Sequence, residues 1–207
     1  MRALSEGKWI FAIELALLVG LGVVWAPGAI VIALLLLFTG WFFRDPDPMV
    51  QPGNDLIVSP ATGKVDVIDE ADEPVFRAER SRRVSIFLSV FDVHTQRAPI
   101  EGVVRLIRYS PGKFANAINP AAASQNENQL IGLEAEGTRV TVRQIAGLIA
   151  RRICTWCKEG ERLAKGAHLG MIRFGSRVDI FLPTDVEVLV ELGQHVKGGE
   201  TVLARRK

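Results

Sequence analysis

The chain divides into one long apolar block and a following region of short alternating segments. No charged residue occurs from Leu15 to Phe43, and Ala26-Pro27-Gly28 interrupts this block near its middle. An apolar run of about 20 residues is long enough to cross a bilayer as a helix. Proline and glycine together break or kink a helix, so the sequence predicts two helical pieces, roughly Trp9–Trp25 and Ala29–Phe43.

Residues 1–45 are therefore predicted to form a hydrophobic helical membrane anchor. At 1.5 Å per residue the two pieces are roughly 22–26 Å long, slightly less than the ~30 Å hydrocarbon core. A kinked single span and a hairpin that enters and returns both fit, and the hairpin is favoured. Basic residues stand on both sides of the block, so the positive-inside bias does not choose an orientation. A cleaved signal peptide fits poorly, because no small-residue cleavage site precedes Arg44.

Residues 46–207 are predicted to form a mainly β domain. Short segments rich in β-branched residues alternate with glycine and proline, which is typical of strands joined by turns. A polar, alanine-rich stretch at Ala115–Asn128 is predicted as a loop with a short helix. The predicted strands are Val65–Ile68, Val84–Leu88, Val103–Tyr109, Arg139–Arg143 and Val178–Leu182.

One internal repeat refines the fold class. Glu159–Leu169 aligns without gaps with Leu192–Val202, 33 positions on, and both copies space glycines and apolar residues three apart. This pattern is typical of the small β-sandwich that carries lipoyl or biotinyl groups, and Ser59–Val65 resembles a further strand and turn of that fold. The lysine signature of such carriers is absent, so the repeat indicates an α+β, lipoyl/biotinyl-like β-sandwich and leaves its function open.

Charge and cysteine content narrow the function classes. A net charge of +2 without a long basic run does not favour nucleic-acid binding. Cys154 and Cys157 have C-x-x-C spacing, but a structural zinc ion needs four ligands and no second pair is present. We expect no metal site and two ordinary thiols in a reducing compartment.

Two short motifs carry candidate chemistry. His94 follows an apolar strand and stands two residues after Asp92, which would place both side chains on one face of an extended segment. A carboxylate there could orient the imidazole. Gly175 and Ser176 lie between two apolar runs, where a strained turn could bring the Ser176 hydroxyl to the preceding carbonyl.

These motifs and several others, in order and spacing, resemble phosphatidylserine decarboxylase proenzymes, in particular their short bacterial and archaeal form. The resemblance covers nearly the whole chain. The matching segments are Phe42–Pro46, Ser59–Gly63, Phe91–His94 with Arg97-x-Pro99, Gly112–Asn116, Asn126–Asn128, Ala150–Ile153 and Arg173–Asp179.

The resemblance implies a pyruvoyl enzyme that cuts itself between Gly175 and Ser176. Ser176 would become a covalent pyruvoyl group at the start of an α chain, residues 176–207, which pairs with a β chain, residues 1–175. A Schiff base between the ketone and the serine amine would release CO₂ and give phosphatidylethanolamine. The implied partner is a phospholipid in the cell (inner) membrane, with the catalytic domain on the cytoplasmic side.

The proposed chemistry also needs a base, an acid and groups that bind the substrate's charges. His94 would serve as both the base and the acid, at different stages, and Asp92 would orient it. Arg97, Arg173 or Arg177 could bind a phosphate or carboxylate.

Members of the family commonly have aspartate in the S-P-A-D-G segment, where this chain has Thr62. Asp92 with His94 could suffice for self-cleavage, Asp66 could substitute, or cleavage could be impaired.

Two alternatives remain open from the sequence. A chain that no longer processes itself would be a non-catalytic, membrane-tethered β-sandwich module, which Thr62 supports. A pyruvoyl decarboxylase acting on a soluble amino acid is the other, and the apolar N-terminus argues against it.

Overall fold

The computed structural model describes residues 2–115, 125–148 and 152–206, and these form two compact units, Met1–Pro46 and Asp47–Lys207. Most of the predicted Ala115–Asn128 loop lies outside the described residues, as do Asn116 and Ala150–Arg151 of the matching segments. The elements are α1 Arg2–Glu6, α2 Lys8–Val24, α3 Ala26–Phe42, β1 Leu56–Val58, β2 Gly63–Glu73, β3 Glu79–Leu88, β4 Thr95–Arg97, β5 Gly102–Ser110, β6 Asn128–Ala135, β7 Thr138–Ile145, β8 Ile153–Thr155, β9 Arg162–Leu163, β10 His168–Ile172, β11 Ser176–Leu182, β12 Glu187–Val188, β13 His195–Val196 and β14 Val202–Arg205.

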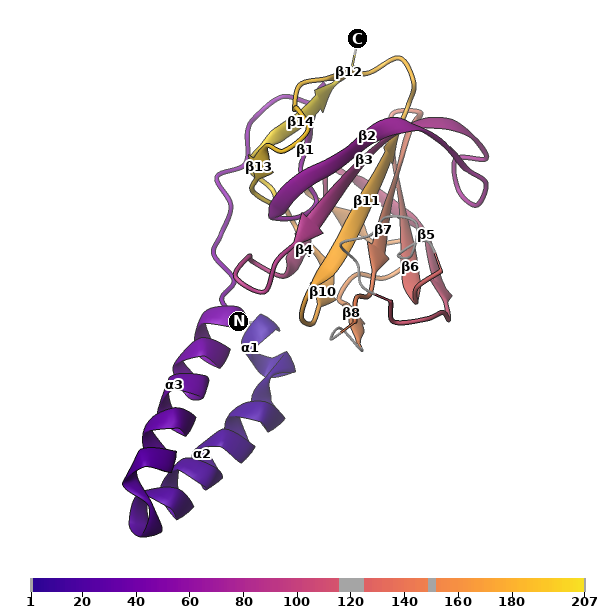
Figure 1. The fold of residues 1–207 in the computed structure, drawn as a ribbon. Coiled ribbons are helices and arrows are strands. Elements are labelled where there is room, and N and C mark those ends of the chain that lie inside the picture. Colours follow the sequence, from indigo (N-terminus) through magenta and orange to yellow (C-terminus); the bar gives the residue numbers. More distant parts are fainter. Residues whose placement is uncertain (1, 116–124, 149–151, 207) are drawn as a thin grey trace. The chain divides into compact units, whose positions relative to one another are not determined.

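The first unit consists of helices, of which α2 and α3 lie side by side and antiparallel (Figure 1). The chain reverses at Trp25 alone, which is extended with φ −156° and ψ 90°. The predicted division into two helices is confirmed, and it lies one residue before Ala26. Pro27 stands in the first turn of α3, where a missing N–H costs nothing. The Thr39 hydroxyl donates to the Glu14 carboxylate at 2.8 Å and so bonds α3 to α2. Each helix has 17 residues, and among the described residues no helix combines the length and hydropathy needed to span a membrane.

The second unit is built almost entirely from antiparallel strands (Figure 1). An eight-stranded curled sheet has the order β13-β2-β3-β11-β7-β6-β5-β9, and two three-stranded sheets have the orders β1-β14-β12 and β4-β10-β8. The structure thus confirms a mainly β domain. All five predicted strands are present, each inside a longer one, whereas β6 was not predicted.

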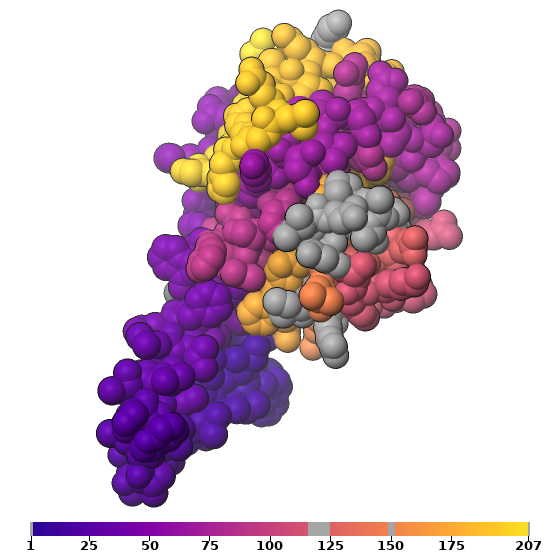
Figure 2. Space-filling view, viewed as in Figure 1, coloured from indigo at the N-terminus to yellow at the C-terminus, as the bar shows by residue number. Residues whose placement is uncertain are grey.

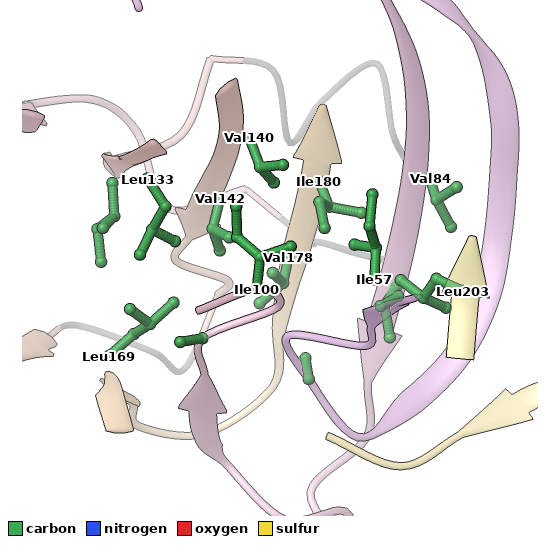
Figure 3. Packing of buried hydrophobic residues seen from close by; sticks show 14 of the residues in the cluster. Ile57, Val84, Ile100, Leu133, Val140, Val142, Leu169, Val178, Ile180 and Leu203 are labelled. Carbon is green, nitrogen blue, oxygen red and sulfur yellow. The ribbon is translucent and has the colours of Figure 1, made fainter. Parts of the chain in front are cut away.

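The core lies on the inner side of the curled sheet (Figure 3). Alternate residues of the central strands point there, as the period of two in a strand requires. Val178 and Ile180 of β11 are fully buried beside Val142 of β7 and Val84 of β3. Burying such side chains stabilises the fold by about 1.5–3 kcal/mol each. This core supports β11, which begins at Ser176.

The outer halves of β2 and β3 pair through charges instead of apolar side chains. Arg83 donates to both Asp69 oxygens at 2.8 and 2.5 Å, and Arg80 lies 3.7 Å from Asp72. Exposed pairs of this kind contribute about 0–1 kcal/mol each. Because these positions are charged, hydrophobic patterning predicted only the apolar ends of both strands.

The internal repeat of the sequence is a repeat of structure. The glycines that the two copies share are left-handed, with φ between 78° and 88°. Equivalent glycines donate backbone hydrogen bonds of 2.7–2.8 Å to carbonyls that stand 39 positions apart: Gly160 to Val104, Gly193 to Val65, Gly166 to Ala98 and Gly199 to Ser59. The acceptor segments Ser59–Val65 and Ala98–Val104 share a proline, a glycine and a valine in register. The second unit therefore contains two similar halves, of which the sequence interpretation found only one pair of copies.

Candidate active site

The predicted cut lies in a strained turn between two sheets. β10 belongs to the three-stranded sheet and β11 to the eight-stranded sheet, and residues 173–175 join them. Phe174 and Gly175 are both left-handed, with φ of 58° and 50°. Glycine takes this conformation without steric cost, whereas a bulky residue such as Phe174 is strained by about 1–3 kcal/mol. Strain is therefore stored directly before the Gly175–Ser176 peptide bond.

Ser176 is the first residue of β11 and is fully buried. It stands opposite Leu88 of β3, and its Oγ has no hydrogen-bond partner among the residues that the structure describes. Leaving a buried hydroxyl without a partner costs about 1–3 kcal/mol. Such an atom calls for an explanation other than stability, and a nucleophile is one.

His94 is fully buried between β3 and β4. Its Nδ1 lies 2.9 Å from the Asp92 carbonyl oxygen. Because a carbonyl only accepts, Nδ1 carries the proton and Nε2 is the basic nitrogen. The His94 carbonyl accepts a bond from the Ile172 N–H at 3.3 Å, which fixes His94 to the strand that leads into the cut.

The expected role of the Asp92 carboxylate needs a correction. Ser89 to Asp92 form a tight turn closed by the Asp92 N–H and the Ser89 carbonyl at 3.0 Å, so the segment is not extended and the same-face argument fails. One carboxylate oxygen accepts from the Ser89 N–H and hydroxyl at 2.8 and 2.7 Å. The other lies 2.8 Å from Nε2 of His195. Asp92 thus orients His94 through its backbone carbonyl and directs its carboxylate to His195.

His195 lies in the second copy of the repeat and was not among the candidate site residues. Its side chain is 57% exposed, yet it makes the bond to Asp92. No sequence signal links the two residues, which are 103 positions apart. The contact also connects the two sides of the predicted cut, since Asp92 precedes Ser176 and His195 follows it.

Two of the three candidate arginines are buried in bonds to the protein itself. Arg177 is 2% exposed and forms a bidentate pair with Asp66, at 2.7 Å to Oδ1. Asp66 stands at the bulge of β2, and both of its carboxylate oxygens accept from this guanidinium. Arg97 is 4% exposed and donates to the Gly166 carbonyl at 3.4 Å. Arg173 is half-buried and stands two residues before Gly175.

Thr62 takes part in the packing of the repeat turns. Its hydroxyl accepts a bond from the Gly198 N–H at 2.9 Å. An aspartate could accept the same bond, so the position has a structural function that threonine retains. Threonine cannot supply the carboxylate that relatives commonly have at this position. Asp66 does not replace it, because its carboxylate is paired with Arg177.

Asp179 is a buried carboxyl on β11 that the sequence interpretation did not single out. It is 3% exposed, and burial raises its pKa, an effect that Ser85 and Arg143 partly oppose. Side chains alternate along a strand, so Asp179 faces away from the side on which Ser176 stands. It is therefore not placed to take the Ser176 proton directly.

The two cysteines are free, buried thiols. Burial raises the pKa of Cys157 to about 11, which suppresses thiolate formation at neutral pH. Within the described part of the chain, no group of three His, Cys, Asp or Glu side chains could hold a metal ion.

Comparison with known proteins identifies the family. The sequence model of the family described as "Phosphatidylserine decarboxylase" matches residues 35–204, and these residues include both His94 and the Gly175–Ser176 turn. The chain belongs to the phosphatidylserine decarboxylase family. Its members are decarboxylases, that is, carboxy-lyases. The comparisons give no support to the alternative of a non-catalytic module.

Individual relatives agree over most of their length. A phosphatidylserine decarboxylase proenzyme of Symbiobacterium thermophilum is 49% identical over 182 residues, which are 87% of this chain and 84% of the relative. Proteins with the same name in Cereibacter sphaeroides and Carboxydothermus hydrogenoformans are 45% and 44% identical and align with 96% and 98% of this chain and with 88% and 95% of the relatives. The word proenzyme in these names fits a precursor that is processed.

Proposed function

We propose that this chain is a proenzyme that cuts itself between Gly175 and Ser176 and then decarboxylates phosphatidylserine to phosphatidylethanolamine and CO₂. The observation that carries the proposal is the buried Ser176 Oγ, without a partner among the described residues, directly after two left-handed residues. Its position in the chain agrees with the resemblance to self-processing proenzymes.

In the first step Oγ of Ser176 attacks the carbonyl carbon of Gly175. The C–N bond breaks, an ester forms, and the hydroxyl proton passes to the nitrogen of Ser176. His94 is the base that we assign to this transfer, because its Nε2 is the basic nitrogen. Release of the strain at Phe174 favours opening of the bond.

In the second step the Cα of residue 176 loses a proton and the ester oxygen leaves as the carboxylate of Gly175. Water hydrolyses the resulting dehydroalanine, ammonia is released, and residue 176 keeps a ketone. The pyruvoyl group supplies an electron sink for decarboxylation once it is present. The site fits this group, because residue 176 is buried at the start of β11 and the group is formed from the chain itself.

The two products of the cut would stay together. Residues 176–207 contribute β11, which lies between β3 and β7 in the eight-stranded sheet, and β13 and β14, which pair with β2 and β1. In the space-filling view the C-terminal residues, in yellow, lie against the purple segments of the β unit (Figure 2). An α chain of 176–207 and a β chain of 1–175 would therefore form a stable heterodimer.

The helical unit is proposed to hold the enzyme at the membrane that contains its substrate. Large apolar side chains on α2 and α3 are exposed, among them Val23 at 84% and Leu37 at 71%. Exposed apolar surface of this extent is typical of a contact with lipid or protein. We place the hairpin in the cell (inner) membrane and the β unit on its cytoplasmic side. The assignment of the β unit to the lipoyl/biotinyl-like sandwich, supported by its two similar halves, belongs to the same proposal.

The test is the size and chemistry of the purified full chain in detergent. We expect fragments of residues 1–175 and 176–207 on a denaturing gel, with a blocked N-terminus on the smaller one by mass spectrometry. Ser176→Ala should abolish both the cut and CO₂ release from phosphatidylserine in mixed micelles. An uncut parent chain with an ordinary serine would refute the proposal. Turnover of free serine in preference to the lipid would instead favour the soluble amino acid alternative.

A further inference from the structure

The two residues assigned to self-cleavage lie at the ends of strands in different sheets. His94 directly precedes β4 of the three-stranded sheet, and Ser176 begins β11 of the eight-stranded sheet. Proton transfer between two side chains requires a relative placement within hydrogen-bond reach, and an error of about 1 Å can cost about 100-fold in rate. What joins the two sheets here therefore matters for the reaction.

Two glutamines of the large sheet reach across to the small one. Gln129 of β6 and Gln144 of β7 stand directly opposite each other, and both are buried. Gln144 donates from Nε2 to Oε1 of Gln96 on β4 at 2.7 Å. Gln129 donates from Nε2 to the Thr155 hydroxyl on β8. Buried amides without partners are costly, so each bond favours one spacing of the two sheets.

The bridge between Gln144 and Gln96 continues to His94. Nε2 of Gln96 donates to the His94 carbonyl at 2.8 Å, and both glutamine side chains of this bridge are fully buried. The same carbonyl accepts the Ile172 N–H at 3.3 Å. The backbone of His94 is thus held by an amide chain that starts on β7, the hydrogen-bonded neighbour of β11.

Gly170 has no side chain, and this leaves room for the bridge between Gln144 and Gln96. It stands opposite Gln96 on β10, and a Cβ atom there would lie 3.3 Å from Nε2 of Gln144 and 2.2 Å from the Cys154 carbonyl oxygen. Any larger residue would therefore push against the bridge and against β8.

We infer that Gln144 and Gln96 are positioning residues, which hold His94 at the distance from Ser176 that self-cleavage needs. The inference rests on the proposed function, in which His94 is the base. Gln129 and Thr155 join the same two sheets through a bond that does not include Gln96, so they provide a matched control within the chain.

The first readout is the rate of self-cleavage of the full chain, followed as the appearance of the 176–207 fragment. Gln144→Met and Gln96→Met keep the volume and remove the bridge, and we expect cleavage to slow by about 10–100-fold. Gln129→Met removes the other bridge and should slow cleavage by less than about threefold. Gln144→Asn, which stays polar but is too short to reach Gln96, replaces Gln144→Met if that variant does not fold.

The second readout reports on His94 itself. In the full chain with Ser176→Ala, which stays uncut, the ring ¹⁵N resonances of His94 are assigned by comparison with His94→Ala. Gln144→Met and Gln96→Met should shift these resonances and their titration midpoint, whereas Gln129→Met should leave both in place. A merely structural loss would lower the melting temperature of all three variants and leave the His94 signals unchanged.

The outcomes separate the inference from the proposed function. If His94→Ala still cleaves and turns over normally, the assignment of the base fails. If His94→Ala is defective but folded Gln144 and Gln96 variants cleave within twofold of the parent, the inference alone is refuted. Slow cleavage with unmoved His94 resonances also refutes it, since the glutamines would then act by another route.

Discussion

Two turns that lead into strands of the eight-stranded sheet each have a buried polar side chain at one end and a non-glycine residue in the left-handed region. The turn between β2 and β3 has Glu73 and Ala78, whose φ is 56°. The turn before β11 has Ser176 and Phe174, whose φ is 58°. Both buried side chains are at most 2% exposed. The two turns differ in what surrounds the buried oxygen atoms.

Glu73 has every bond that its carboxylate can use. It accepts from the N–H groups of Val75, Phe76 and Arg77 at 2.9, 3.0 and 2.6 Å, and from the Thr141 hydroxyl at 3.0 Å. The Ser176 hydroxyl has none among the described residues. A satisfied buried group stabilises a turn, whereas an unsatisfied one adds a cost that only another purpose explains. The comparison therefore separates a structural turn from a reactive one.

Glu73→Ala should have the largest effect on stability. It leaves three backbone N–H groups and a buried hydroxyl without an acceptor, which costs about 3 kcal/mol or more in the free energy of unfolding. Denaturant unfolding of the full chain with Ser176→Ala, which stays uncut, measures the loss. In the otherwise parent chain, self-cleavage at temperatures where the variant is folded should be retained. A stable variant that does not cleave would contradict the separation of the two turns.

Gly175→Ala should combine a smaller loss of stability with a loss of reactivity. An alanine at φ 50° is strained by about 1–2 kcal/mol. Its Cβ would meet no atom within 4 Å, so the strain is conformational and not steric crowding. Relief of the strain by a change of φ would move the scissile carbonyl away from the Ser176 hydroxyl, and we expect cleavage to slow at least tenfold.

Gly137→Ala is the matched control for that variant. Gly137 lies in the hairpin between β6 and β7, has φ 78°, and likewise has open space at the Cβ position. It should lose a similar amount of stability and cleave at the parent rate, as judged by thermal unfolding and gel analysis. If both variants cleave equally slowly, the cost lies in stability and not in the geometry of the cut.

Asp179→Asn should have the smallest effect, and it should depend on pH. Burial raises the pKa of Asp179 in the folded chain, so its contribution to stability is fully present below the unfolded pKa of about 3.9. That contribution is lost as the pH rises through the higher folded pKa. The asparagine variant cannot ionise at this position. As the pH rises through this range, its free energy of unfolding should therefore increase relative to that of the parent. Urea unfolding of both uncut chains at pH 4 to 7 measures the difference, and a variant that instead falls behind with rising pH would contradict it.

The fold was predictable where one side chain in two is apolar. Val178 and Ile180 predict a strand, because a strand with one buried face has an apolar side chain at every second position. The outer parts of β2 and β3 were not predicted, because their pairing relies on ion pairs such as Asp69 with Arg83. The similarity of Ser59–Val65 to Ala98–Val104 was not predicted. It follows from the structure, where both segments accept hydrogen bonds from equivalent glycines of the repeat.

The candidate site was predictable as a set of residues and not as an arrangement. Gly175, Ser176 and His94 were identified from local motifs and their resemblance to a family, and the structure describes a strained turn and two buried side chains at these positions. The expected contact between the Asp92 carboxylate and His94 was wrong, because a tight turn replaces the extended segment. Membrane insertion of the helical unit remains a prediction.

The sequence by itself determined the apolar N-terminal block, the mainly β character of the rest and the identity of the Gly175–Ser176 turn, because each depends on neighbouring residues. Only the tertiary structure decided the partners of these groups. Asp92 meets His195, Arg177 meets Asp66, and the glutamine bridge leads to His94. These contacts join residues far apart in the chain, and their geometry follows from how the sheets pack around a common core.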